Sequence, residues 1–175
     1  DGVNFLEQAL KIFPDYFLAL ERLGQEYGAQ EKWELSYNLF KKAVSVNERG
    51  FNCWYGMSIA LGQLQKTEES ITAIQKAVSI NPSSVEAQFL LGTSLRKMQK
   101  FEDAEKSLKE ADKLAKGKAA DIHWNLALLY AHNLKKYSSA ADHLEQYLKI
   151  KPNDAQSESV KKLIKQFRDK AAAGN

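Results

Sequence analysis

The chain has 175 residues, of which 44% are apolar and 27% are charged, a balance typical of a folded domain with a substantial core. Its net charge of +3 comes from 25 basic and 22 acidic residues, so the strong one-signed field of a nucleic-acid-binding protein is not expected. No apolar run approaches the roughly 20 residues that a membrane span needs, and one cysteine excludes an internal disulfide. We therefore expect a protein of a reducing compartment, with the cytoplasm favoured, no nucleic-acid partner and no membrane insertion.

The first predicted element is a short helix over residues 3–12, in which Leu6, Ala9 and Ile12 fall at helical spacing before Pro14. A helix of this length is unstable alone in water and needs a neighbour to cover its apolar face. The sequence offers no earlier helix for that purpose. We therefore expect an exposed face here, which could pack on upstream repeats, with Asp1 as a cut edge, or allow self-association through this N-terminal helix.

Apolar and small residues then recur at a fixed interval of 34 residues through most of the chain. The interval is carried by Ala9, Ala43, Ala77 and Ala111, and by Leu6, Phe40, Ile74 and Leu108. Within each period, two stretches of helical spacing are separated by a short break, so each unit is predicted to be helix, turn, helix. A period of this length indicates an array of repeats.

These residues resemble the tetratricopeptide repeat family, whose unit carries a large residue at position 4, Leu-Gly at 7 and 8, small residues at 20 and 27, and Pro at 32. The pattern is read from Leu20, Leu23, Gly24, Tyr27, Ser36, Phe40 and Ala43, then from Trp54, Met57, Leu61, Ser70, Ile74, Ala77 and Pro82, then from Gln88, Leu91, Gly92, Leu95, Ala104, Leu108 and Ala111. The resemblance implies an all-α fold, a right-handed α-solenoid of stacked antiparallel helix pairs.

The repeats divide the chain into six predicted segments. They are the second helix of a truncated repeat at 1–16, repeats at 17–50, 51–84, 85–118 and 119–154, and a capping helix with its tail at 155–175. The fourth repeat implies two single-residue insertions, one within 117–120 and one in the turn at 132–136. Because Lys116 replaces the usual Pro, the second helix of the third repeat is expected to run longer than its siblings, until Gly117 stops it.

Residues that could carry catalysis or bind a metal are sparse. His123 and His132 are nine residues apart, about half a turn out of phase, and His143 lies on the following helix. Without a Cys or a second His at ligand spacing, a zinc site is not expected, and the histidines are interpreted as surface residues. Cys53 is interpreted as a small, partly buried filler. We therefore expect no catalytic residue, no metal and no cofactor.

In the tetratricopeptide family, positions 5 and 9 of the first helices line a concave groove that binds peptides. Position 5 holds Tyr55, Phe89 and Trp124 in successive repeats, and a ladder of aromatics favours an apolar ligand. The predicted peptide-binding residues are Tyr55, Ile59, Phe89, Thr93, Arg96, Trp124, Asn125 and Leu128. The alternative is that these aromatics pack only against neighbouring repeats.

The sequence therefore predicts a non-catalytic protein–protein interaction module, part of a larger protein or assembly, that binds an apolar or amphipathic segment of another protein. A clamp for carboxylate-terminal chaperone tails is absent, because Glu21, Gln25 and Gly56 occupy its first three positions. The related RNA-reading repeats are disfavoured by the 34-residue period and the low net charge. The alternative function is a structural segment that self-associates.

Overall fold

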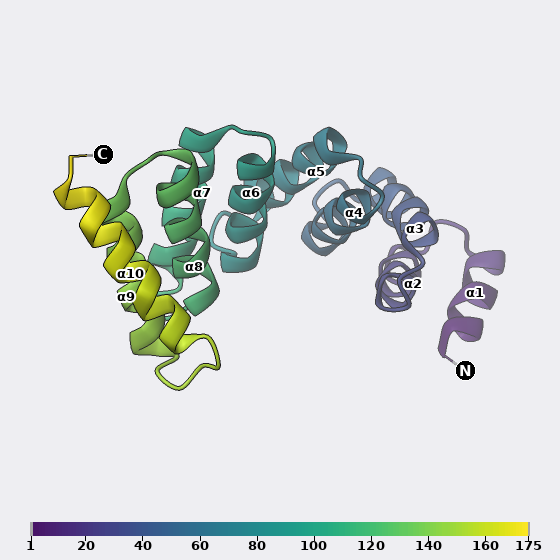
Figure 1. The fold of residues 1–175 in the computed structure, drawn as a ribbon. Helices are drawn as coiled ribbons and strands as arrows, with labels where there is room; N and C mark the ends of the chain where they lie inside the picture. The colour runs from purple at the N-terminus through teal and green to yellow at the C-terminus, as the bar shows by residue number, and fades with distance from the viewer. Residues whose placement is uncertain (1, 175) are drawn as a thin grey trace. The chain divides into compact units, whose positions relative to one another are not determined.

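The computed structural model describes residues 2–174, and these residues fold into ten α-helices and one π-helical turn without any strand. Figure 1 shows the helices in chain order. Asp1 lies outside the described residues, and the expectation that it is a cut edge lies outside them as well. In the described part, none of the helices is both long and apolar enough to cross a membrane.

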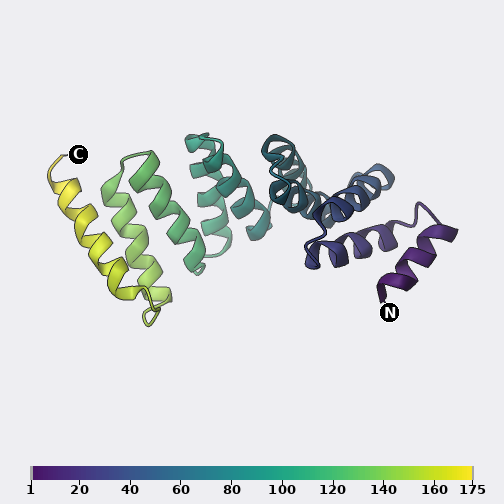
Figure 2. The ribbon, with the colours of Figure 1, turned by 45° about the vertical axis from the view of Figure 1, so that its right-hand side comes forward.

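Contacts divide the chain into two compact units, called here the N-terminal unit (residues 1–82) and the C-terminal unit (residues 83–175). The N-terminal unit contains α1 (Gly2–Ile12), α2 (Phe17–Ala29), α3 (Trp33–Val46), α4 (Phe51–Gln63) and α5 (Thr67–Ile80). The C-terminal unit contains α6 (Val85–Lys97), α7 (Phe101–Leu114), α8 (Ala120–Leu128), the π-helical turn η1 (Leu129–Asn133), α9 (Tyr137–Ile150) and α10 (Ser157–Ala172). In each unit, helices adjacent in sequence pack as pairs, α2 with α3, α4 with α5, α6 with α7, and α8 with α9 (Figure 2).

The turn inside each pair has three residues, and its middle residue has a positive φ angle. These residues are Glu31 (φ 57°), Gln65 (φ 62°), Gln99 (φ 59°) and Lys135 (φ 56°). In the first three turns, the next residue donates its amide to a carbonyl five residues earlier, as Lys66 N does to Leu61 O at 2.9 Å. A left-handed residue followed by such a bond ends the first helix of each pair, a role that glycine more often fills.

The core of the N-terminal unit is organised around the ring of Phe40, which is buried between α2 and α4. A Cβ atom at Gly24 would lie 2.9 Å from this ring, and one at Gly56 would lie 2.5 Å from it. Both helices therefore approach the ring closely only because they carry glycine at these positions. The buried Leu20 and Met57 complete the contact.

The C-terminal unit closes on α10, which packs against α9. Val160 and Phe167 are buried on its inner face, and the ring of Phe167 stacks on Tyr137 with centroids 6.1 Å apart. Arg168 adds ion pairs to Asp142 at 2.6 Å and to Glu145 at 2.8 Å. The segment expected to form a capping helix is thus a helix that covers α9 with apolar side chains.

The expectation about the irregular end of the third repeat is wrong. Helix α7 has 14 residues, as α3, α5 and α9 have, so it does not run longer than its siblings. Lys116 and Gly117 both have positive φ angles, of 55° and 67°, and they end the helix as soon as it reaches its usual length. The missing proline is therefore replaced by two left-handed residues.

The insertion expected in the turn at 132–136 lies within the helix instead. Residues 129–133 form η1, where Leu134 N donates to Leu129 O, five residues earlier, at 3.0 Å. A π-turn accommodates one additional residue inside an α-helix. The following turn keeps its three residues and its left-handed Lys135.

Candidate functional site

Two of the predicted binding residues, Tyr55 and Ile59, line one pocket of about 360 Å³ in the N-terminal unit. We call it the α2–α4 pocket, because helices α2, α3 and α4 supply its walls. Its lining consists of Gly24, Gln25, Gly28, Trp33, Ser36, Phe40, Asn52, Tyr55, Gly56 and Ile59. Three of these positions are glycines, and at Gly24 and Gly56 the absence of a side chain lets the ring of Phe40 lie close against the helix backbone.

The walls of the α2–α4 pocket are mostly apolar, with a few polar groups. Ser36 Oγ donates to Gly24 O at 2.8 Å, so this hydroxyl serves the packing of α3 on α2. Asn52 is exposed, and its Nδ2 donates to Glu21 Oε1 at 3.2 Å. An apolar cavity with a few polar groups suits an apolar side chain of a bound peptide, while the polar backbone of that peptide stays outside the cavity. Gln25 and Asn52 were not among the predicted binding residues, although both lie on first helices.

In the C-terminal unit, the other predicted binding residues lie on two helices. Phe89, Thr93 and Arg96 occupy successive turns of α6, with spacings of four and three residues that bring them to one face of the helix. Thr93 Oγ1 donates to Leu90 O at 3.0 Å, so its hydroxyl bonds within the helix. The Nε atom of Arg96 is buried and has no hydrogen-bond partner among the described residues.

The remaining predicted residues lie on α8. The ring of Trp124 lies 5.5 Å from that of Tyr147 on α9, at a tilt of 51°. Asn125 Nδ2 donates to Asp121 O at 2.9 Å. Leu128, like Trp124 and Phe89, is partly buried. These aromatic side chains therefore contribute to helix packing and still present part of their surface to solvent.

The single thiol of the chain is unsuited to nucleophilic chemistry. Cys53 is fully buried, deeper than the partly buried filler expected from the sequence, and its Sγ lies 3.5 Å from Glu21 Oε2. Burial, reinforced by the nearby carboxylate, raises the pKa of Cys53 to about 12. The thiolate is the reactive form of cysteine, and at neutral pH it is essentially unpopulated here.

The expectation that all the histidines lie on the surface is wrong for His123, which is only 3% exposed. Its Nδ1 atom lies 3.0 Å from Nδ1 of His143 on α9, and its Nε2 atom lies 3.1 Å from Gly117 O. His123 occupies position 4 of its repeat, a position that the family pattern places in the core. This position in the repeat was the feature of the sequence that indicated the burial of His123. Among the described residues, no three His, Cys, Asp or Glu side chains gather as a metal site.

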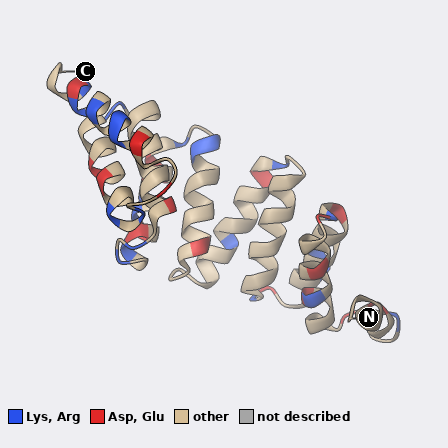
Figure 3. Cartoon of the chain, turned by 60° about the horizontal axis from the view of Figure 1, so that its bottom comes forward, with Lys and Arg blue, Asp and Glu red and all other residues tan. Residues whose placement is uncertain are grey.

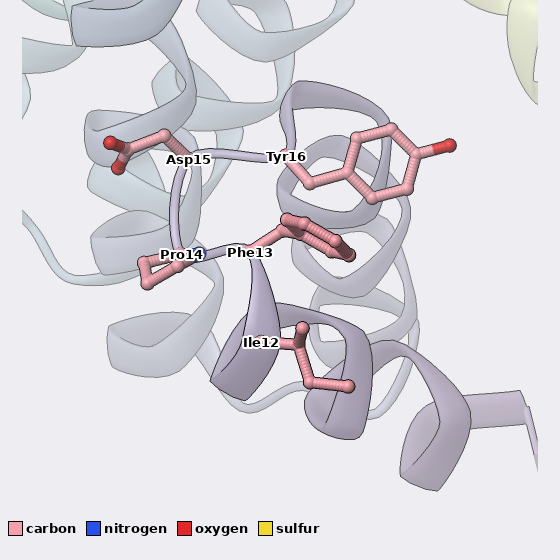
Figure 4. A pocket seen from close by; sticks show the side chains of 5 residues that line it. All are labelled: Ile12, Phe13, Pro14, Asp15 and Tyr16. Carbon is pink, nitrogen blue, oxygen red and sulfur yellow. The ribbon is translucent and has the colours of Figure 1, made fainter.

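A second apolar surface surrounds the first helix, and we call it the N-terminal apolar surface. It consists of Phe5, Ile12, Phe13, Tyr16 and Leu18, which are 71%, 71%, 65%, 48% and 56% exposed. Helix α1 buries none of its residues. Figure 4 shows Ile12, Phe13 and Tyr16 on one side of the link to α2, with Asp15 pointing to the other side. These residues line an open pocket of about 600 Å³.

Charges of both signs are interspersed along the helices (Figure 3). In the C-terminal unit they form local ion pairs, such as Glu105 with Lys109 at 2.6 Å and with Lys136 at 3.2 Å. Hydrogen bonds from Lys109, Tyr130 and Lys136 outweigh the effect of burial and lower the pKa of Glu105. The ion pair of Glu105 with Lys136 links α7 to the turn before α9.

The fold defines a class of protein, an all-α array of repeated helix pairs. The sequence profile of the tetratricopeptide repeat matches residues 55–117 and residues 89–155, which together make up more than half of the chain. The chain belongs to the tetratricopeptide repeat family. The predicted fold class, an α-solenoid of antiparallel helix pairs, is thereby confirmed.

Similar proteins and structures agree with this assignment. A segment of 58 residues is 33% identical to anaphase-promoting complex subunit 3 of Schizosaccharomyces pombe; it spans 33% of this chain and only 9% of that protein. The solved structure of YrrB, described as a TPR protein with an unusual peptide-binding site, superposes with a TM-score of 0.80 at 22% identity, covering 91% of this chain and 81% of YrrB. MamA superposes with a TM-score of 0.81 at 18% identity, covering 88% of this chain and 89% of MamA. These two likenesses concern the fold.

Proposed function

We propose that this chain is a non-catalytic interaction module that binds an apolar or amphipathic peptide or helix of another protein. The observation that carries the proposal is the α2–α4 pocket, an apolar cavity that Tyr55 and Ile59 share with three glycines. Tetratricopeptide proteins are protein-interaction repeats, and this supports the general role. The role of Phe89, Trp124 and Leu128 as further contacts belongs to the same proposal.

In this proposal the module consists of four helix pairs. We assign them to the repeats at 17–50, 51–84, 85–118 and 119–154, with the segment 1–16 as the second helix of a truncated repeat and 155–175 as a cap. The assignment is supported by the start of α2 at Phe17, of α4 at Phe51 and of α6 at Val85, which are 34 residues apart. Each pair then contributes one first helix to binding.

Binding in the N-terminal unit would place one apolar side chain of the partner in the α2–α4 pocket, against Phe40 and Ile59. Burying a side chain of the size of leucine or phenylalanine contributes about 1.5–3 kcal/mol. The amides of Gln25 and Asn52 are placed to bond the polar backbone of such a segment. A single pocket of this size supports a moderate affinity.

The proposal is tested by identifying a partner and then removing the pocket wall. Affinity capture with this chain, followed by mass spectrometry, supplies the partner peptide, whose affinity is measured by calorimetry. We expect Ile59→Ala to weaken binding by about 1–3 kcal/mol while helical content by circular dichroism is unchanged. Leu35→Ala, at a residue that is 48% exposed and outside the pocket, is the matched control. Equal affinity of Ile59→Ala and the wild-type chain would refute the role of the pocket.

A second function, a structural segment that self-associates, is favoured by one observation. The N-terminal apolar surface leaves Phe5, Ile12 and Phe13 largely exposed, and apolar patches of this kind mark interaction sites. Sedimentation equilibrium over a range of concentrations discriminates the two functions. Self-association that is lost in Phe5→Ser with Ile12→Ser supports the second function, whereas a monomer at every concentration removes it.

A further inference from the structure

The pair formed by the buried His123 and the partly buried His143 has no part in the proposed binding site, and it connects three helices of the C-terminal unit. His123 on α8 faces His143 on α9, with ring centroids 5.3 Å apart. On its other side, His123 Nε2 meets Gly117 O, directly after α7, and lies 3.5 Å from Asp112 Oδ1 on α7. This Asp112 oxygen is buried and accepts no hydrogen bond from the described residues.

The contacts determine which nitrogen of each ring carries the proton. A carbonyl oxygen only accepts hydrogen bonds, so His123 Nε2 carries the proton that it donates to Gly117 O. When His123 is neutral, its Nδ1 is therefore bare and accepts. His143 Nδ1, at 3.0 Å, must be the donor. The two rings thus hold opposite tautomers, with one proton between them.

Added protons act on this arrangement in two steps. One added proton leaves the bond intact, because the imidazolium that forms still donates to the bare nitrogen of the other ring. A second added proton places two N–H groups face to face at the short Nδ1 to Nδ1 distance, and two positive rings repel each other. The pair is therefore stable with at most one added proton.

The charges around the pair determine how readily it accepts protons. Burial lowers the pKa of His143, and positive charge on His123 and on Lys109 of α7 lowers it further, whereas Asp112 of α7 and Asp142 of α9 oppose the shift. Tyr130 of η1 stacks on His143 with centroids 5.5 Å apart. Arg168 of α10 pairs with Asp142, which limits the ability of this carboxylate to balance a charge on His143.

We propose that His123 and His143 form a proton-sensitive joint, which holds α8 against α9 while one proton is shared between the rings and releases α8 in acid. The joint has consequences beyond the pair, because α8 is connected to α7 through Gly117 and continues into η1. Any effect on ligands at Trp124 and Leu128 rests on the proposed function. The joint itself does not, because it is measured on the chain without a partner.

The first test is the tautomeric state, read from the nitrogen chemical shifts of the three histidines in the full chain. At about pH 8 we expect His143 in the Nδ1–H form and His123 in the Nε2–H form. His132, which is exposed, serves as the internal reference. The Nε2–H form at His143 would overturn the proposal, because the two Nδ1 atoms would then have no proton to share.

The second test replaces the imidazole of His143 by a phenyl ring, which removes the titratable group and keeps an aromatic ring at this position. Amide hydrogen exchange of α8 is compared at about pH 8 and about pH 5, after correction for the intrinsic pH dependence of exchange. We expect opening of α8 to increase several-fold in acid in the wild-type chain and in His132→Gln, and to change little in His143→Phe. If His143→Phe does not fold, His143→Gln takes its place. An equal increase in acid with and without His143 would overturn the joint.

Discussion

The two units of the chain differ in where they leave apolar surface. Every large apolar residue that is clearly exposed in the described part of the chain belongs to the N-terminal unit; these residues are Phe5, Ile12, Phe13, Tyr16, Leu18, Leu35 and Val46. In the C-terminal unit, α10 covers the last helix pair, and ion pairs occupy its outer surface. The two units therefore differ in how completely their apolar side chains are covered within the described residues.

The terminal helices make this comparison sharpest. Helix α1 buries none of its residues, although it lies on α2 and Tyr27 donates a hydrogen bond from its hydroxyl to Glu7. Helix α10 buries Val160 and Phe167. The first and the last helix of the described residues thus differ in burial, and substitutions can measure the difference.

The largest effect is expected from the aromatic residues of these two helices. Phe167→Ala removes a buried ring and should lower the free energy of unfolding by about 3–5 kcal/mol. Phe5→Ala changes an exposed ring and should alter it by no more than about 0.5 kcal/mol. Urea denaturation of the two variants under the same conditions checks both values. Equal losses would show that α1 is as firmly packed as α10.

The next effect concerns two glycines, one in each unit, that lie on the first helix of a helix pair. A Cβ atom at Gly92 on α6 would lie 2.7 Å from Leu108 Cγ and 3.1 Å from Leu108 N, so Gly92→Ala should cost about 1–3 kcal/mol. At Gly62 on α4, a Cβ atom would meet only Ser70 Oγ, at the ordinary distance of 3.5 Å. Gly62→Ala should therefore stabilise the chain by about 0.5–1 kcal/mol through helix propensity. Thermal unfolding gives both signs, and a stabilising Gly92→Ala would contradict the close packing of α6 on α7.

Acid should lower the stability of the C-terminal unit before that of the N-terminal unit, because all three histidines lie in the C-terminal unit. The pKa of His143 is lowered in the folded chain, so below about pH 6.5 the unfolded chain binds the proton more readily. The contribution of His143 is complete above that pH and is lost as the pH falls towards its folded pKa. Hydrogen exchange between about pH 8 and pH 5 should show α8 and α9 weakening before α2 to α5. Uniform weakening of both units would contradict this.

The smallest effect is expected from the surface charges of the C-terminal unit. The side chain of Arg168 is 41% exposed, and those of Asp142 and Glu145 are 59% and 44% exposed, so solvent screens both ion pairs. Arg168→Met should cost about 0.2–1 kcal/mol, and less at about 1 M salt. Chemical denaturation at low and high salt provides the measurement. A loss as large as that of Phe167→Ala would mean that charge, and not the buried ring, holds α10.

Much of the fold was predictable because the repeat is visible in residue types that packing demands. The recurrence of Ala43, Ala77 and Ala111 and the large residues beside them predicted paired helices, and these three alanines are fully buried in the structure. His123 shows where residue type misled the interpretation. Its position in the repeat indicated the core, whereas histidine as a residue type suggested the surface, and the hydrogen bonds to His143 and Gly117 decide in favour of the core.

The candidate site was predictable only in part. Tyr55 and Ile59 were expected to bind and do line the α2–α4 pocket, but the pocket also depends on Phe40, whose ring lies where a Cβ atom at Gly24 or Gly56 would be. A sequence pattern shows that a residue is small, and it does not show whether a neighbouring side chain fills the vacant volume. The same limit applies to the aromatics of α6 and α8, whose partial burial depends on packing across neighbouring helices.

The three-residue turn with its left-handed middle residue has a consequence for how such arrays diverge after tandem duplication. In the pair formed by α8, η1 and α9, the turn has the usual three residues and Lys135 has a φ angle of 56°, while the first helix holds one additional residue as η1. The helix body is therefore the tolerant part of each copy, and the turn is the part that duplication must preserve. Changes in length should accumulate at the C-terminal ends of first helices, because a π-turn there holds one additional residue and leaves the following turn and helix unchanged.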